Sequence, residues 1–212
     1  MDAAVFRAWI VTAAEVIEAN RDHLTQLDAA IGDADHGINL ARGFTAVLGA
    51  LDAAPAKTVT PGAILTLTGN TLISKVGGAS GPLYGTAFRR AGKALGDAAD
   101  VDLPALSAAL DAALAGVQQL GAAREGDKTM VDALAAATRA FGKAVADGAS
   151  QDEALACLAE AAAAGATATV SMQALKGRAS YLGPRSVGHE DPGAVSTALI
   201  LGALRDAARV RR

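Results

Sequence analysis

The chain has 212 residues, of which 51% are hydrophobic, and its formal net charge is −3. This length suits a single domain, which we predict over residues 1–212, and the composition excludes a disordered chain and argues against nucleic-acid binding. The single cysteine excludes an intrachain disulfide. The acidic N-terminal segment is unlike a signal peptide, and no uninterrupted apolar run reaches the length of a membrane span. We therefore expect a cytoplasmic protein without a membrane partner.

Helical periodicity dominates the sequence from end to end. Aromatic residues make up only 3% of the chain and alanine is abundant, which favours closely packed helices over sheets. In chain order, the spacing of apolar residues predicts eight helices, at roughly 3–27, 38–52, 61–75, 80–97, 103–120, 130–147, 151–174 and 192–209. Short connections imply antiparallel neighbours. The predicted fold is all-α, an eight-helix antiparallel up-and-down bundle or barrel.

The connections between these helices fall into two groups. In an up-and-down bundle, alternate connections lie at the same end of the molecule. Those at 28–37, 76–81, 121–129 and 175–191 carry most of the glycines and charged residues found between helices, whereas those near 53–60, 98–102 and 148–150 are plain. The topology therefore predicts that all the unusual segments gather at one end and form a site.

The first unusual segment places Asp28, Asp33 and Asp35 within eight positions. On one helix, residues 28 and 33 would point about 140° apart. Because Gly32 and Gly37 disfavour a continuous helix, we predict a loop that brings the carboxylates together. Oxygen ligands select a hard cation, and Mg²⁺ fits better than Ca²⁺ because the spacing is not that of an EF-hand. The alternative is that one aspartate merely caps the next helix.

Two glycine-containing segments come next. GGASGPLYG, at 77–85, places Ser80 before a predicted helix, where backbone N–H groups can bind an anion, although a plain turn has the same composition. GAAREGDKTM has the glycine spacing of a P-loop, but Asp127 stands where a lysine is required and no strand precedes it. We expect Asp127 and Thr129 to cap the following helix instead.

The last unusual segment, 177–194, is long for a connection in a compact bundle, and such loops are usually functional. Its candidate residues are Arg178, Arg185, His189 and Asp191. Arginine suits phosphate recognition, whereas a single histidine is more often structural. Acidic cation ligands, anion-binding glycine segments and arginines at one end together predict a Mg²⁺–phosphate site, which is most simply a site for a nucleotide.

The chain closely resembles the nucleotide-binding L subunits of bacterial dihydroxyacetone kinases, a domain that also forms the C-terminal half of single-chain dihydroxyacetone kinases. The resemblance spans about residues 5–208 and rests on GDADHGINLARGF, GGASGPLYGTAF, GDKTM and GRASYLGPRSVGHEDPGA, in that order. It implies an eight-helix barrel that binds ADP or ATP at one end through two Mg²⁺ ions. The matching metal ligands are Asp28, Asp33 and Asp35. The matching nucleotide-binding residues are His36, Gly37, Ile38, Asn39, Ala79, Ser80, Gly121, Met130, Arg178, Asp191, Pro192 and Gly193.

The resemblance also implies an activity and two partners. The family transfers a phosphoryl group to dihydroxyacetone held on a histidine of a separate K subunit, so we expect no catalytic base in this chain. In the phosphotransferase-system branch, bound ADP is a resident cofactor that a phosphohistidine M subunit rephosphorylates. We expect this chain to be a standalone L subunit of that branch. Homodimerisation is left open.

Other functions are compatible with the same residues. The chain could be an ATP-dependent L subunit that acts on dihydroxyacetone or on another ketose such as erythrulose. It could instead be a nucleotide-loaded binding module that docks on a transcription regulator. A stand-alone Mg²⁺ phosphatase is disfavoured because the sequence offers no clear nucleophile. Neighbouring genes for K and M subunits would separate these readings.

Overall fold

A computed structural model describes residues 1–54 and 60–210 of the chain. In these residues the chain forms nine α-helices and two short 3₁₀-helices, and it forms no strand. The α-helices are α1 (Ala3–Ala19), α2 (Arg21–Ile31), α3 (His36–Ala53), α4 (Pro61–Lys75), α5 (Ser80–Leu95), α6 (Leu103–Gly121), α7 (Met130–Ala146), α8 (Gln151–Ala168) and α9 (Pro192–Val210). The 3₁₀-helices are η1 (Thr169–Ser171) and η2 (Arg178–Ser186).

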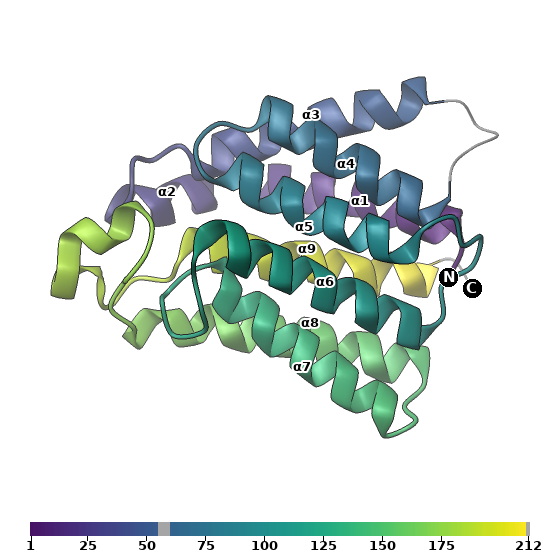
Figure 1. The fold of residues 1–212 in the computed structure, drawn as a ribbon. Coiled ribbons are helices and arrows are strands. Elements are labelled where there is room, and N and C mark those ends of the chain that lie inside the picture. The colour runs from purple at the N-terminus through teal and green to yellow at the C-terminus, as the bar shows by residue number, and fades with distance from the viewer. Residues whose placement is uncertain (55–59, 211–212) are drawn as a thin grey trace.

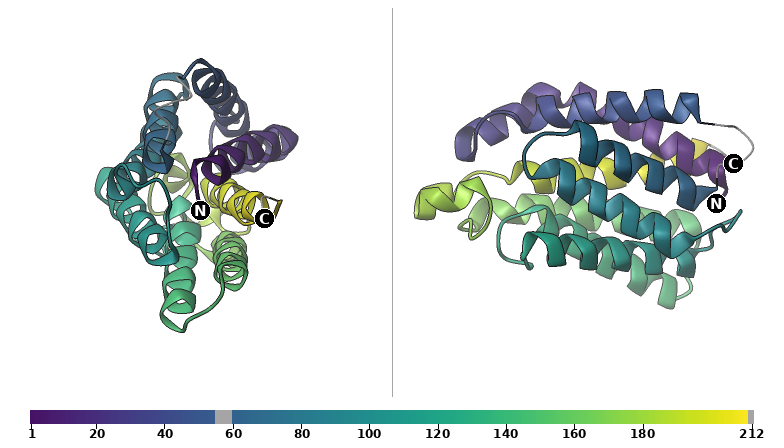
Figure 2. Two further views of the ribbon diagram at one scale, coloured as in Figure 1. Left: turned by 90° about the vertical axis from the view of Figure 1, so that its right-hand side faces the viewer. Right: turned by 45° about the horizontal axis from the view of Figure 1, so that its top comes forward.

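The helices form a closed ring, as the end view in Figure 2 shows. From α3 onward each helix packs on the next along the chain, and α1 packs on α9 and thereby closes the barrel. The indole Nε1 of Trp9 on α1 donates a hydrogen bond of 2.8 Å to the carbonyl oxygen of Ile200 on α9 across this seam. The predicted all-α antiparallel barrel is confirmed, with α1 and α2 together in the place of its first helix.

The first predicted helix, 3–27, was wrong as a single element. The chain breaks at Asn20, whose backbone is not helical (φ −103°, ψ 10°) and whose side-chain amide donates to the carbonyl oxygen of Val16 at 2.8 Å. Asparagine bonds readily to nearby backbone and so competes with the helix. The second piece, α2, runs on to Ile31. Asp28 therefore lies in a helix, and only residues 32–35 form the loop that we expected over 28–37.

Two other boundaries differ from the prediction. The helix expected over 151–174 ends at Ala168 and continues only as the 3₁₀ turn η1. The long connection after it contains η2, which is interrupted at Gly183 by a left-handed backbone (φ 56°). The plain connection predicted near 53–60 lies largely outside the described residues.

The barrel interior is filled mainly by leucine and alanine, around a small aromatic cluster. Trp9 contacts Phe6 and Phe88 at ring-centroid distances of 5.9 and 5.7 Å, and Phe44 packs on Phe88 at 6.4 Å. Glycine allows α4 and α5 to approach closely: a Cβ atom on Gly69 would lie only 2.5 Å from a backbone oxygen of α5. A larger residue at this position would force the two helices apart.

By length and composition alone, one helix in the described part of the chain, Gln151–Ser171, is apolar enough to cross a membrane. Core helices of soluble proteins pass the same test. Here the helix packs between α7 and α9, with Leu155 and Leu158 buried in the barrel core. Its high mean hydropathy reflects its many alanines.

Candidate functional site

A cavity of about 190 Å³ opens at the end of the barrel where four helices begin. Its lining comes from segments that are far apart in the sequence, within 28–36, 78–84, 128–130, 176–179 and 191–193. Figure 1 shows these segments at one end of the molecule, opposite both termini. This is the gathering of unusual connections that the up-and-down topology predicts.

The cavity is ringed by helix N-termini. His36, Ser80, Met130 and Pro192 are the first residues of α3, α5, α7 and α9, and all four line it. The first-turn N–H groups of a helix have no partner within that helix, and the macrodipole is positive at this end. Each of the four ends contributes a partial positive charge to the cavity. The arrangement suits a polyanion.

Three carboxylates lie at one edge of this cavity. Oxygen atoms of Asp28, Asp33 and Asp35 all fall within 4.8 Å of one another, and Asp28 is buried. The backbone folds around Asp28: its Oδ2 accepts hydrogen bonds from the N–H groups of Asp35 (2.9 Å) and His36 (3.2 Å). A Cβ atom on Gly32 would lie 2.0 Å from Asp28 Oδ1, so the residue after α2 has no room for a side chain. An all-oxygen donor set of this kind fits a hard cation such as Mg²⁺.

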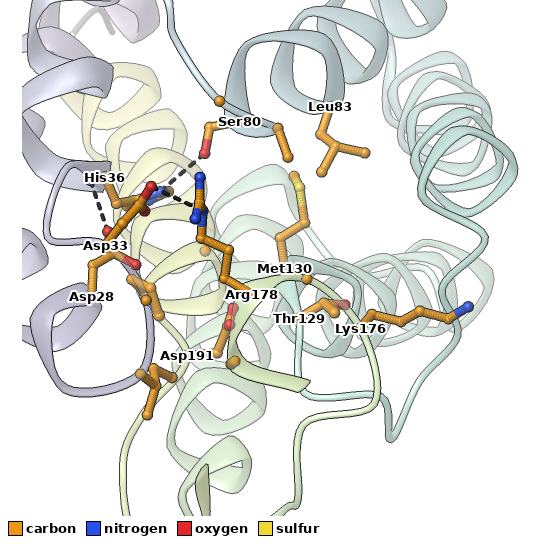
Figure 3. Close-up of a pocket in the computed structure, with 18 of the residues that line it drawn as sticks. Asp28, Asp33, His36, Ser80, Leu83, Thr129, Met130, Lys176, Arg178 and Asp191 are labelled. Carbon is orange, nitrogen blue, oxygen red and sulfur yellow. Dashed lines mark hydrogen bonds and ion pairs between the residues drawn. The ribbon is translucent and has the colours of Figure 1, made fainter. Parts of the chain in front are cut away.

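Arg178 contacts the same carboxylate cluster from the opposite wall. Its Nε lies 2.9 Å from Asp33 Oδ2, and 71% of its side chain is exposed. Figure 3 shows Arg178 beside Asp33. Arg178 begins η2, the segment that borders the cavity with Gly177 and Ala179. A cation at the carboxylates would compete with this ion pair and release the guanidinium toward an anionic ligand.

Behind the carboxylates, a buried hydrogen-bonded network links three helices. His36 Nδ1 lies 3.1 Å from Ser80 Oγ, and its Nε2 lies 2.8 Å from Ser196 Oγ. The Tyr84 hydroxyl lies 2.7 Å from Ser196 Oγ and donates to the carbonyl oxygen of Gly193 at 2.9 Å. Burial lowers the pKa of His36 and raises that of Tyr84, so both are neutral at physiological pH. The network fixes the starts of α3, α5 and α9 relative to one another.

Asp191 caps the fourth helix start. Its Oδ2 accepts from the N–H of Ala194 at 2.7 Å, and its own N–H donates to Thr169 Oγ1 at 2.9 Å. Withdrawal of the Asp191 carboxyl from water raises its pKa to about 7, and the negative charges of Asp132 and Asp28 act in the same direction. The carboxyl is therefore partly protonated near neutral pH as long as no cation is bound nearby.

This shift predicts a pH dependence of stability. The folded carboxyl of Asp191 holds its proton up to pH about 7, whereas an unfolded aspartate loses it near pH 4. In EDTA, the free energy of unfolding should therefore fall through this window as pH rises. The contribution of Asp191 is at most about 1.4 kcal/mol per pH unit. Urea unfolding of the wild type and of Asp191→Asn at several pH values measures the difference. Parallel curves would contradict the raised pKa.

The structure brings most of the predicted site residues into one cavity. Eleven of the fifteen line it: Asp28, Asp33, Asp35, His36, Ala79, Ser80, Met130, Arg178, Asp191, Pro192 and Gly193. The other four do not: Gly37 packs against the Arg21 carbonyl oxygen, Ile38 is 51% exposed, Asn39 accepts a hydrogen bond from Arg42, and Gly121 lies behind Leu83. Contact of any of these residues with a nucleotide stays a prediction.

The predicted caps of α7 were half correct. Thr129 is the N-cap, and its Oγ1 accepts from the N–H of Val131 at 3.1 Å. Asp127 does not cap the helix, because its carboxylate instead accepts from the N–H of Arg124 at 2.9 Å and closes a turn. The second member of the capping box is Asp132, which accepts from the N–H of Thr129.

Sequence reasoning missed several residues that build the cavity. Tyr84 lines the cavity and bonds to Ser196 behind it. Leu83 also lines the cavity and, with the predicted Met130, gives it an apolar side, as Figure 3 shows. The one least expected is Lys128, which is completely buried. An isolated lysine in a loop before a helix is ordinarily exposed, so the sequence gives no signal for it.

Comparison with known proteins shows the family to which the chain belongs. The chain matches the family model of the DAK2 domain over residues 30–206, which is most of its length. It belongs to the DAK2 domain family. The DAK2 chain is 41% identical over 201 residues to the ADP-binding subunit DhaL of the PEP-dependent dihydroxyacetone kinase of Escherichia coli K12, and the match covers 95% of each protein.

Solved structures with the same fold come from a longer kinase. The DAK2 chain matches the native dihydroxyacetone kinase of C. freundii with a TM-score of 0.73 at 27% identity, over 97% of this chain and 34% of that one. The complex of that kinase with AMP-PNP and Mg²⁺ matches with a TM-score of 0.69 at 30% identity, over 96% and 33% of the two chains. The DAK2 chain thus spans about a third of the C. freundii kinase and nearly all of the E. coli subunit.

Proposed function

We propose that this chain is the nucleotide-binding subunit of a dihydroxyacetone kinase. It holds ADP or ATP with two Mg²⁺ ions in the cavity and passes a phosphoryl group to dihydroxyacetone on a partner K subunit. A phosphohistidine M subunit then rephosphorylates the bound ADP. The observation that carries the proposal is the cluster of Asp28, Asp33 and Asp35 at a cavity ringed by four helix N-termini. The partners and a cytoplasmic location belong to the same proposal.

The names of the similar proteins support this function. The E. coli relative is an ADP-binding subunit of a PEP-dependent dihydroxyacetone kinase, and the C. freundii kinase was solved with AMP-PNP and Mg²⁺. An ADP-binding subunit and a kinase solved with a nucleotide and Mg²⁺ are both consistent with the proposed Mg²⁺–nucleotide site.

Different residues of the cavity have different roles in nucleotide binding. The three aspartates hold Mg²⁺, which neutralises charge on the transferring phosphoryl group when it is bound. The N-termini of α3 and α5, together with Ser80, face the phosphates. Leu83 and Met130 offer an apolar wall for the base. Arg178, released from Asp33, is placed to bind the phosphate nearest the solvent. The chain positions the phosphoryl group, and the acceptor comes from the partner.

Single-turnover transfer tests the function. The chain loaded with one equivalent of Mg-ATP and mixed with dihydroxyacetone and a K subunit should yield close to one equivalent of dihydroxyacetone phosphate, read by coupled oxidation of NADH. EDTA or omission of the K subunit should abolish the product, because neither the metals nor the acceptor would be in place. Phosphate release from ATP without any K subunit would favour the phosphatase instead.

A further inference from the structure

Lys128 stands out among the described residues because its side chain is completely buried, which is rare for lysine. It lines the cavity, yet the proposed mechanism assigns it no role. Its backbone is left-handed (φ 59°), a conformation that L-residues other than glycine seldom adopt. A residue with an unfavourable backbone conformation and a buried charge must be stabilised by its contacts. The contacts of Lys128 therefore indicate its role.

The backbone on both sides of Lys128 is fixed by one carboxylate. Asp132 accepts hydrogen bonds from the N–H of Gly126 at 2.5 Å and from the N–H of Thr129 at 2.7 Å. These bonds hold the turn that leads into α7. With the backbone fixed in this way, the lysine side chain points into the interior at this end of the barrel.

The ammonium group joins chain segments that are distant in sequence. Nζ donates to the carbonyl oxygen of Thr169 at 2.6 Å and to that of His189. Thr169 lies at the end of α8, and His189 lies just before the start of α9. The hydroxyl of Thr169 in turn accepts from the N–H of Asp191, the N-cap of α9. Lys128 thus ties the start of α7 to the segment that leads into α9, both directly and through Thr169.

These two helix starts adjoin one another in the cavity wall. Residues 128–130 and 191–193 both line it, and a Cβ atom on Gly193 would lie 3.4 Å from Met130 Cβ. The other two basic side chains at the cavity are attached differently. Lys176 precedes the segment η2, and Arg178 is its first residue. In Figure 3 the ammonium group of Lys176 points away from the carboxylates. Lys128 is the cation that is built into the wall.

We propose that Lys128 is a positioning residue of the nucleotide site, whose ammonium group sets the spacing between the α7 and α9 walls of the cavity. The proposal rests on the proposed function, because it takes the cavity to be the nucleotide site. The carboxylates of Asp191, Asp132 and Glu190 favour the charged form of Lys128 and oppose the effect of burial, which lowers its pKa. Without the ammonium group, two carbonyl oxygens lose their donor and the segment that leads into α9 loses its direct bond to the start of α7.

The test compares nucleotide affinity with stability. Lys128→Met keeps the length of the side chain but removes its donors, and it should weaken Mg-ADP binding roughly tenfold to a hundredfold, the range for lost hydrogen bonds to a charged group. Leu158→Ala is the matched control: Leu158 is fully buried in α8, and its truncation lowers the melting temperature without touching the cavity. The control should bind Mg-ADP within twofold of the wild type in calorimetry well below both melting temperatures.

Conservative variants keep the proposal falsifiable if Lys128→Met does not fold. Lys128→Arg retains hydrogen-bond donors and should recover much of the affinity. Thr169→Val removes the hydroxyl that accepts from Asp191 and should weaken binding severalfold. Wild-type affinity in Lys128→Met or Thr169→Val, or an arginine variant that binds no better than the methionine variant, overturns the positioning role. A wild-type chain that does not bind Mg-ADP overturns the proposed function itself, and the role of Lys128 with it.

Discussion

Asp35→Asn is expected to weaken binding of Mg-ADP by at least about a hundredfold, beyond the range for residues that only support metal ligands. Of the three carboxylates, Asp35 is the one whose substitution disturbs the fewest other contacts. It is the N-cap of α3 but makes no side-chain capping bond, so asparagine removes charge and leaves the helix intact. Asp28, in contrast, accepts two backbone N–H groups, and Asp33 is paired with Arg178.

Thermal melts and calorimetry both measure this effect. At a Mg-ADP concentration of a hundred times Kd, the wild-type chain should gain about 2.7 kcal/mol of stability, and EDTA should remove the gain. Asp35→Asn should gain at most about 0.4 kcal/mol at that concentration. Its metal-free form should melt no lower than the wild type, because the substitution also removes repulsion within the carboxylate cluster.

Asp147→Asn is the control for the loss of one aspartate. Asp147 lies at the C-terminal end of α7, exposed and paired with Lys143, and a surface ion pair of this kind contributes little. This variant should bind Mg-ADP as the wild type does. Wild-type affinity for Mg-ADP in Asp35→Asn would show that the carboxylate cluster is not the metal site.

The helices and their ends could be predicted because the signals for them are local. Thr60, Asp102, Thr129 and Ser150 each cap the helix that follows with a side-chain oxygen, and the apolar spacing within each helix is regular. The position of the site followed from connectivity alone, since alternate connections in an up-and-down barrel share an end. Neither inference needed long-range contacts.

The features that the sequence did not reveal depend on contacts between distant segments. Lys128 is buried because carbonyl oxygens 41 and 61 residues away meet at its ammonium group. The motif GDKT contains no local signal that predicts those partners. Asp28 was expected in a loop because Gly32 and Gly37 follow it, whereas α2 continues to Ile31 and the N–H groups of residues 35 and 36 fold back onto the Asp28 carboxylate. Local sequence patterns do not predict such contacts between distant segments.

ADP release from the wild-type chain should be slower than about 0.01 s⁻¹. A resident cofactor must survive many turnovers, and a typical kcat is on the order of 10 s⁻¹. With an association rate constant of roughly 10⁶ M⁻¹s⁻¹, this release rate corresponds to a Kd near 10 nM. An exchanging ATP substrate would have to leave as fast as turnover, which places Kd at about 10 μM or above. The two donor chemistries therefore differ by about three orders of magnitude in one measurable rate.

Rapid dilution of chain loaded with labelled ADP into excess unlabelled Mg-ADP measures the rate directly. The structure favours slow release because the nucleotide would be held by metal ligands on α2 and the loop after it, by four helix starts, and by Arg178 on η2. Asp35→Asn is the internal control, because loss of a metal ligand should bring release into the range of seconds or faster. Complete exchange within one second in the wild-type chain would instead identify ATP as an exchanging substrate and remove the need for a phosphohistidine partner.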